Sequence, residues 1–228
     1  MRLIIPHLGL GDLIAFADLI TKLAGGKHAV VPCWEHNEIS AKSIFVNHKN
    51  IHVVPMTSTM ELDQLANETP FRIGMGHYSD CPRMDGEDMI EWVYRSVNMD
   101  PAERFEDGVV EKAAERVAQR DIEAVLNHTK ASMHFVHNDK DRGFIIDPRK
   151  HGPAWWEGLC LPVNDGRSIL SYCDLMKQSA FIHCIDSAFL HLAEQLPLQD
   201  HQQLFYHRYA RPGSEGYNTL RHPWKVLE

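Results

Sequence analysis

The sequence lacks any long hydrophobic run. A helix that crosses a bilayer needs roughly 20 consecutive apolar residues, and no segment of this 228-residue chain approaches that length. The short apolar stretch at the N-terminus is interrupted by Pro6, His7 and Asp12 and has no small-residue cleavage site. We therefore expect neither a membrane span nor a signal peptide. With 44% hydrophobic and 24% charged residues, the composition is that of a globular protein.

The sequence also lacks the usual motifs for disulfide frameworks and metal sites. Its five cysteines are scattered and include no CxxC pair, which argues against both a disulfide framework and a structural zinc site. We expect reduced thiols in a cytoplasmic compartment. The 15 histidines include no HExxH motif, so we interpret most of them as surface or loop residues and expect no metal.

Positive charge is in deficit. The chain has 23 basic and 31 acidic residues, which gives a net charge of −8. Capture of nucleic acid by the whole surface is therefore disfavoured, although a local basic groove stays open as an alternative.

Apolar runs of strand length alternate with helix-period segments along most of the chain. Strands are expected at 2–6, 28–34, 51–56 and 71–76, and again at 132–137, 158–163, 180–186 and 203–208, with helices between most of them. This alternation predicts an α/β protein with parallel sheets. We divide it into two small Rossmann-like lobes, residues 1–128 and 129–228, of which the second is reduced. Helical patterns at 87–99 and 109–126 would join the lobes.

The segment HLGLGD, residues 7–12, follows the first expected strand. In open parallel sheets, ligands bind beyond the carboxyl ends of the strands. Gly9 and Gly11 would permit a tight turn close to a ligand, and Asp12 would lie at the N-cap of the next helix. Asp12 is therefore either a cap alone or a catalytic group. The dinucleotide pattern GxGxxG is incomplete because residue 14 is Ile, which disfavours a nicotinamide cofactor.

Two later segments occupy equivalent positions in the second lobe. In CIDSAFLHLAEQL, a strand leads to Asp186 and Ser187 at the start of a helix, with His191 one turn later. These residues could bind a phosphate, or Asp186 and Ser187 could simply cap the helix. In HNDKDRGFIID, Lys140 and Arg142 lie close together after an expected strand and are suited to binding two phosphates. A solvated charged turn is the alternative there.

The tail that follows residue 206 carries four cations, Arg208, Arg211, Arg221 and Lys225. We interpret it as a plain solvated tail in preference to a small basic patch.

Together, HLGLGD, HNDKDRGFIID and IDSAFLHLA, in this order, resemble the GT-B glycosyltransferases of the heptosyltransferase-like type, especially compact members found in bacteria and in viruses, including phage. The segment DMIEWVYRSVNMDPAERFED similarly resembles their interlobe helix and turn, so the resemblance covers most of the chain. It implies a nucleotide-sugar donor held by the C-terminal lobe and an acceptor held by the N-terminal lobe.

The resemblance also implies roles for particular residues. Asp12 would be the general base, with His7, Gly9 and Gly11 forming the acceptor-side loop. The donor would be bound by five residues of the second lobe: Lys140, Arg142, Asp186, Ser187 and His191. No metal or other cofactor is required by this scheme.

The implied acceptor is a glycan or, as for some viral enzymes of this fold, a hydroxymethylated base in DNA that is flipped into the cleft. Two other classes stay open. The chain could be a non-catalytic GT-B-like module that binds a nucleotide or a partner protein, or, least favoured, an NAD-linked oxidoreductase.

Overall fold

The N-terminal lobe is a parallel sheet with helices between its strands. The computed structural model describes residues 1–119, 133–146, 159–160, 162, 165–212 and 220–228. The first sheet has the order β3-β2-β1-β4 and is parallel throughout. Its strands are β1 (Arg2–Ile5), β2 (Ala29–Trp34), β3 (Ile51–Met56) and β4 (Arg72–Gly74). All four fall within the predicted segments, which confirms this part of the sequence analysis.

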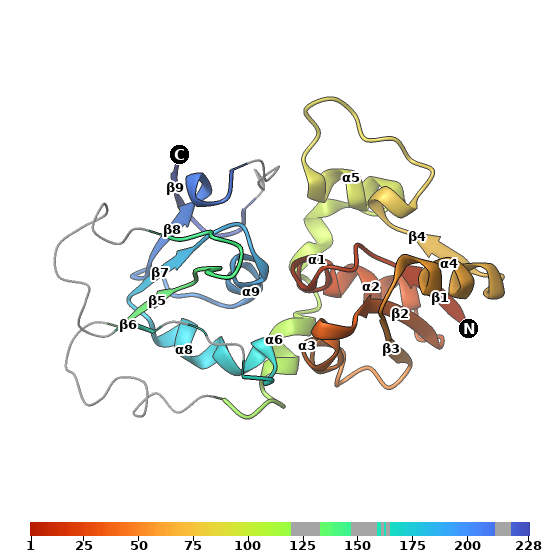
Figure 1. The fold of residues 1–228 in the computed structure, drawn as a ribbon, viewed down its shortest axis with the longest axis horizontal. Coiled ribbons are helices and arrows are strands. Elements are labelled where there is room, and N and C mark those ends of the chain that lie inside the picture. Colours follow the sequence, from red (N-terminus) through yellow and green to blue (C-terminus); the bar gives the residue numbers. More distant parts are fainter. Residues whose placement is uncertain (120–132, 147–158, 161, 163–164, 213–219) are drawn as a thin grey trace.

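The C-terminal lobe is also built on a parallel sheet, with the order β6-β5-β7-β8-β9. The strands are β5 (His134–Val136), β6 (Leu159–Cys160), β7 (Phe181–Cys184), β8 (Gln203–His207) and β9 (Lys225–Leu227). Four of them were predicted, so the two Rossmann-like lobes are confirmed (Figure 1). The predicted boundary between residues 128 and 129 lies outside the described residues.

The helices follow the predicted segments with two corrections. They are α1 (Leu10–Ala15), α2 (Ala17–Ala24), α3 (Glu38–Ile44), α4 (Thr59–Glu68), α5 (Met89–Ser96), α6 (Val109–Ala114), α8 (Cys173–Gln178) and α9 (Ala188–Gln195). The single helix expected after HLGLGD is divided at Phe16, because α1 packs on α9 of the other lobe whereas α2 packs on β1 and α6. The helix expected over 109–126 ends at Ala114 in its described part.

The two lobes meet through a continuous apolar core. Leu13 and Ile14 of α1 and Leu190 and Leu192 of α9 are fully buried in one cluster that spans both lobes. Burial of each such side chain contributes about 1.5–3 kcal/mol. In Figure 1, α1 and α9 lie side by side between the sheets, as their contacts also show. The carboxyl-end loops of the two sheets are therefore held together by packing.

The segment between the lobes is anchored on a buried carboxylate. Asp18 of α2 accepts hydrogen bonds from the backbone N–H groups of Asp107, Gly108 and Val109, at 2.8, 3.0 and 3.0 Å. It thereby satisfies donors at the start of α6, which intrahelical bonds leave free. The Asp18 side chain is only 1% exposed. These hydrogen bonds connect α2 to the start of α6, about 90 residues later in the chain.

In its described parts, residues 206–212 and 220–228, the C-terminal tail is folded, which corrects its interpretation as a plain solvated tail. Strand β9 extends the second sheet beside β8. Glu194, buried in α9, accepts hydrogen bonds from the backbone of Arg221 and His222 and, at 2.7 Å, from Trp224 Nε1. The carboxylate of Glu194 therefore attaches the tail to α9.

Among the residues that the structure describes, four histidines belong to the interior rather than to the surface: His134, His183, His191 and His207. Three of them lie on adjacent strands of the C-terminal sheet, where His183 Nδ1 and His207 Nε2 are 2.9 Å apart. Cys33, Cys81, Cys173 and Cys184 are free thiols. No helix among the described residues is long and apolar enough to cross a membrane.

Candidate functional site

The site is formed by two similar corners, each a strand, a short loop and a helix start. We call residues 6–12, the loop after β1 with the first turn of α1, the N-terminal corner, and residues 185–188, the loop after β7 with the first residue of α9, the C-terminal corner. Both lie at the carboxyl ends of parallel strands, where ligands bind in open α/β sheets. The contact of α1 with α9 brings the two corners together.

Glycine makes this contact possible. A Cβ atom at Gly11 would lie 2.9 Å from Cδ2 of His191 and 3.6 Å from Cα of Ala188. A Cβ atom at Gly9 would lie 2.8 Å from Oδ2 of Asp12. Gly11 therefore permits the close approach of the lobes, and Gly9 leaves room for the Asp12 carboxylate.

Asp12 is not the N-cap residue, which corrects the sequence prediction. The N-cap of α1 is Gly9, without a side-chain hydrogen bond, and Asp12 lies in the first turn of the helix. Its Oδ1 is 3.7 Å from Nδ1 of His7. The backbone N–H of His77 donates to Nε2 of His7 at 3.2 Å, so the Nδ1 edge of that ring is directed to Asp12.

Asp12 has a strongly perturbed acidity. Its pKa is raised from 3.8 to about 7, mainly by burial and then by the negative charge of Asp186, against the smaller opposing contributions of a backbone hydrogen bond and of the charge of Arg211. The side chain nevertheless keeps 20% of its surface exposed. A partly accessible carboxyl group with a pKa near neutrality is suited to proton transfer.

Asp186 and Ser187 form the C-terminal corner and are nearly buried. Ser187 is the N-cap residue of α9 but makes no side-chain capping bond. Its Oγ instead lies 2.9 Å from Nδ1 of His137, which follows β5. Burial lowers the pKa of His137 to about 4, so this ring is neutral at physiological pH.

His191 lies inside the lobe interface. It is 3% exposed, and burial lowers its pKa to about 3, with smaller contributions from Arg104 and Arg211 in the same direction. A contact from His191 to a phosphate would therefore be a hydrogen bond from a neutral ring and not an ion pair.

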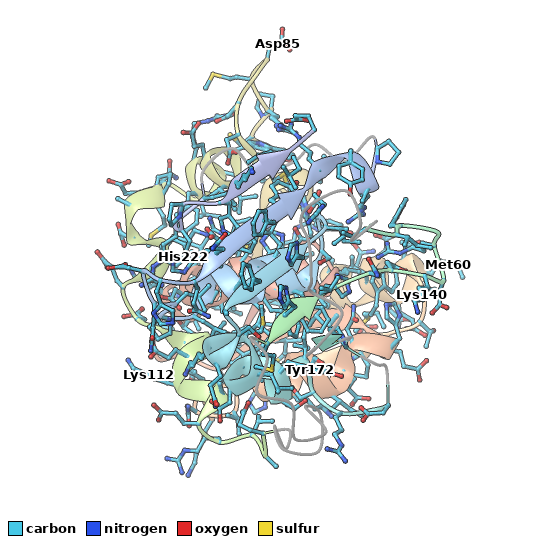
Figure 2. All side chains as sticks on the ribbon, turned by 90° about the vertical axis from the view of Figure 1, so that its left-hand side faces the viewer. Met60, Asp85, Lys112, Lys140, Tyr172 and His222 are labelled. Carbon is cyan, nitrogen blue, oxygen red and sulfur yellow. The ribbon has the colours of Figure 1, made fainter. Side chains whose placement is uncertain are left out.

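Lys140 and Arg142 lie in an exposed turn after β5, and Figure 2 shows Lys140 at the surface. Arg142 forms an ion pair with Asp139 of the same turn. Its guanidinium carbon is also 5.6 Å from the ring centroid of Phe144. Asp139 therefore offsets part of the positive charge that the sequence assigns to this turn.

Arg211 is the cation that the sequence analysis missed at this site. Its Nη1 donates to the backbone oxygen of Asp186 at 2.6 Å, and its guanidinium carbon is 5.7 Å from the Phe144 centroid. The structure thus groups Asp12, Asp186, Ser187 and Arg211, and Phe144 links Arg142 to them. Arg211 follows strand β8, so the rule that selected the other loops could have identified it.

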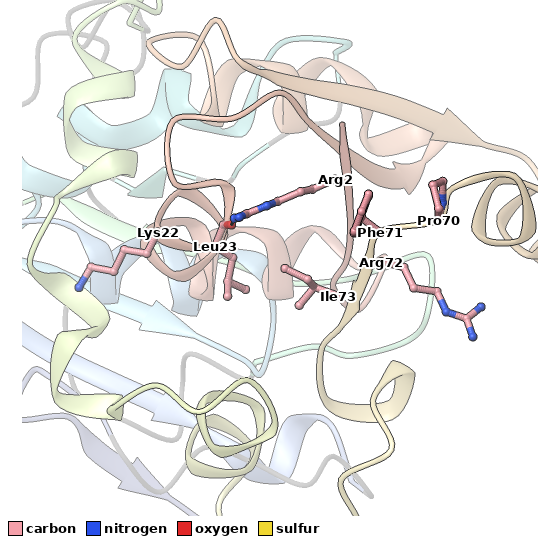
Figure 3. A pocket seen from close by; sticks show the side chains of 7 residues that line it. All are labelled: Arg2, Lys22, Leu23, Pro70, Phe71, Arg72 and Ile73. Atoms are coloured by element: carbon pink, nitrogen blue, oxygen red, sulfur yellow. Dashed lines mark hydrogen bonds between the residues drawn. The ribbon is translucent and has the colours of Figure 1, made fainter.

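A separate cavity of about 420 Å³ lies at the amino ends of β1 and β4, the opposite end of these strands from the site. It is lined by Arg2 and Arg72, at the beginnings of β1 and β4, and by parts of α2. Figure 3 shows Lys22 and Arg72 extending in opposite directions, so their charges do not converge on one ligand. Among the described residues, no group of three or more His, Cys, Asp or Glu side chains could hold a metal.

The fold is that of a two-lobed α/β protein of the GT-B type. The solved structure of E. coli heptosyltransferase WaaC with ADP-2-deoxy-2-fluoro heptose is similar to this chain, with a TM-score of 0.51 and 10% sequence identity. The similarity covers 100% of this chain and 93% of that protein. No protein family model matches the sequence, and no curated protein matches it either. The heptosyltransferase-like resemblance is thus confirmed at the level of the fold.

Proposed function

We propose that this protein is a glycosyltransferase that moves a sugar from a nucleotide-activated donor to an acceptor hydroxyl group, with Asp12 as the general base. The observation that carries the proposal is the position and acidity of Asp12. Its carboxylate lies where two parallel-sheet lobes meet, and its pKa of about 7 lets it both accept and release a proton near neutral pH.

The donor side of the proposal rests on the cations of the C-terminal lobe. Arg211 lies beside Asp186, and Arg142 and Lys140 lie in the turn after β5. Arginine binds phosphate oxygens in a bidentate way and lysine acts as a point charge. The similar heptosyltransferase structure contains an ADP-sugar, which supports a nucleoside diphosphate sugar as the donor here. Asp186, Ser187 and His191 would form the wall beside it.

In the proposed reaction, the acceptor hydroxyl attacks the anomeric carbon of the donor sugar. A new carbon–oxygen bond forms, the bond from that carbon to the phosphate oxygen breaks, and the hydroxyl proton passes to Asp12. The nucleoside diphosphate leaves with an additional negative charge, which Arg142, Lys140 and Arg211 would stabilise. Because these side chains supply positive charge, the scheme requires no metal.

The test measures nucleotide release and nucleotide binding in parallel. Purified protein is incubated with UDP-, GDP- and ADP-sugars, and release of the nucleoside diphosphate is followed with water or an added glycan as acceptor. Asp12→Asn should reduce turnover by about 100-fold or more, since general base catalysis contributes roughly 10² to 10⁴. The thermal stabilisation by the free nucleoside diphosphate should remain, because Asp12 does not bind it.

Asp80→Asn is the matched control, since Asp80 is an exposed carboxylate of the same lobe. It should leave turnover unchanged. Stabilisation by a nucleoside diphosphate without turnover of any donor would instead favour a non-catalytic binding module. Absence of both would contradict the glycosyltransferase proposal.

A further inference from the structure

A cluster of aromatic rings borders the N-terminal corner. We call His7, His77, Tyr78 and Trp92 the aromatic wall. The His7 and His77 rings are stacked with centroids 4.7 Å apart, and His77 meets Trp92 edge to face at 4.6 Å. His7 lies 6.2 Å from Tyr78 and 6.4 Å from Trp92 in further edge contacts. Such geometries are favourable for ring pairs, so the rings support one another.

Local backbone geometry fixes the wall in place. His77 and Tyr78 belong to the short 3₁₀ helix η2 (Gly76–Tyr78), which follows β4. A Cβ atom at Gly74 would lie 1.6 Å from the backbone oxygen of Tyr78, and one at Gly76 would lie 2.8 Å from Nε2 of His7. Only glycine fits at these two positions, and η2 can therefore fold directly onto His7.

The wall presents two of its rings to solvent beside Asp12. Trp92 is only 3% exposed, whereas Tyr78 is 41% exposed and His77 is also exposed. His7 contacts Asp12 at 3.7 Å. Burial raises the pKa of Tyr78, and the charges of Asp63 and Asp12 raise it further, so both carboxylates lie close enough to act on the phenol.

A cation lies against the buried ring of the wall, since the guanidinium carbon of Arg83 is 5.8 Å from the Trp92 centroid. Two arginines lie in residues 76–96, and both are engaged by Glu87: Arg95 by an ion pair with its carboxylate, and Arg83 by hydrogen bonds to its backbone oxygen at 2.7 and 3.0 Å. Asp12 and Asp63 both act on the exposed Tyr78 phenol, and Arg211 offsets part of the charge of Asp12. An anionic acceptor would therefore meet repulsion here.

We infer that the exposed rings of His77 and Tyr78 are the platform for the acceptor, and that the acceptor is an uncharged sugar ring. This inference rests on the proposed function, because it takes Asp12 as the base. An aromatic ring packs well against the apolar C–H face of a sugar, and a hydroxyl at the edge of that sugar would reach Asp12. A base within DNA would bring phosphates that need free cations, and the two arginines of this segment are already engaged.

The experiment measures acceptor binding without any donor. Methyl glucoside and methyl galactoside, both uncharged, are compared with methyl glucuronide, which differs by a carboxylate, and with an oligonucleotide that contains hydroxymethylcytosine. Binding is followed by saturation-transfer NMR. We expect at least one uncharged glycoside to bind at least tenfold more tightly than the glucuronide and the oligonucleotide.

Variants locate the binding on the wall. Tyr78→Ala and His77→Ala should each weaken binding of the glycoside by roughly tenfold, about 1.4 kcal/mol, because each variant removes a ring contact together with the apolar area that it buries. Tyr78→Phe should retain binding because the ring remains. Phe71→Ala removes an exposed ring next to the start of β4, away from the carboxyl end where the wall lies. This variant should have no effect on glycoside binding. Asp63→Asn should selectively improve binding of the glucuronide.

Three results would overturn the inference: preferred binding of the glucuronide or the oligonucleotide, unchanged binding in both alanine variants, or binding of none of the probes. The proposed function is judged separately by donor turnover with water as acceptor. A protein that hydrolyses a donor but prefers the glucuronide would keep the proposed function and lose only this inference.

Discussion

The two corners of the site have the same backbone plan and opposite chemistry. Each places a loop after a central parallel strand and begins a helix, α1 or α9, that packs on the other. The N-terminal corner carries glycines, Asp12 and the aromatic wall. The C-terminal corner carries the buried Asp186 and is approached by Arg211. One corner is therefore acidic and lined by rings, whereas the other is bordered by cations.

This difference indicates which part of a reaction each lobe can serve. Cations near backbone N–H groups favour a diphosphate, whereas a partly accessible carboxyl group with a pKa of about 7 favours a neutral hydroxyl group. The contact of α1 with α9 places the two corners next to each other. Their side chains suit different parts of the proposed reaction, donor binding in the C-terminal lobe and proton transfer in the N-terminal lobe.

The largest effect is expected from removal of the C-terminal cations. The double variant Arg142→Ala, Arg211→Ala should weaken nucleoside diphosphate binding by about 100-fold, because each hydrogen bond to a charged group contributes roughly 1.5–3 kcal/mol. Isothermal titration with ADP, GDP and UDP measures the effect. The control Lys27→Ala, Lys49→Ala removes two exposed lysines of the N-terminal lobe. An equal loss of nucleoside diphosphate affinity in both double variants would mean that binding depends on the overall charge of the protein and not on these two arginines.

An intermediate effect is expected where the corners touch. Gly11→Ala should lower the free energy of unfolding by about 1–3 kcal/mol, as overpacking does, since the new methyl group would meet His191. Gly9→Ala should instead mainly reduce turnover, because its methyl group would meet the carboxylate of Asp12. Urea unfolding and donor turnover of both variants separate these outcomes. An equal free energy of unfolding for Gly11→Ala and wild type would contradict the predicted clash, because it would mean that α1 and α9 can move apart without cost.

The smallest effect concerns the pH at which Asp12 titrates. Asp186 raises the pKa of Asp12 and Arg211 lowers it. Turnover of the wild type should rise with pH through about 7 as Asp12 loses its proton. The midpoint should move to lower pH in Asp186→Asn and to higher pH in Arg211→Gln. Profiles at saturating donor measure this, and shifts in the same direction in both variants would argue against the electrostatic explanation.

The same pKa shift has a consequence for stability. The folded state holds the Asp12 proton more tightly than the unfolded state, so the contribution of Asp12 to stability falls as pH rises from about 4 to about 7. Asp12→Asn should therefore have a higher Tm than wild type at pH 8 and a similar Tm at pH 4. Thermal unfolding across this pH range checks the sign, and a lower Tm for the variant at pH 8 would contradict it.

Much of the fold could be predicted because strand and helix patterns are local properties. The runs at 29–34 and 51–56 are apolar and flanked by turn residues, and they form β2 and β3 as expected. The break at Phe16 could not be predicted, because it depends on which lobe each half of the segment packs against. Strand β9 was missed for a similar reason. It has only three residues, and what makes it a strand is its pairing with the neighbouring strand β8.

The sequence by itself determined the alternation of strands and helices and the glycine turn of the HLGLGD loop, because these depend on residues that are neighbours in the chain. It also determined the scarcity of positive charge, which is a property of composition alone. Only the tertiary structure decided that Arg211 lies at Asp186, that His191 is buried against Gly11, and that His77 and Tyr78 lie beside Asp12. The pKa of Asp12 was likewise decided only by the tertiary structure. Burial and the approach of a carboxylate 174 positions later raise it, and both exist only when the lobes pack together.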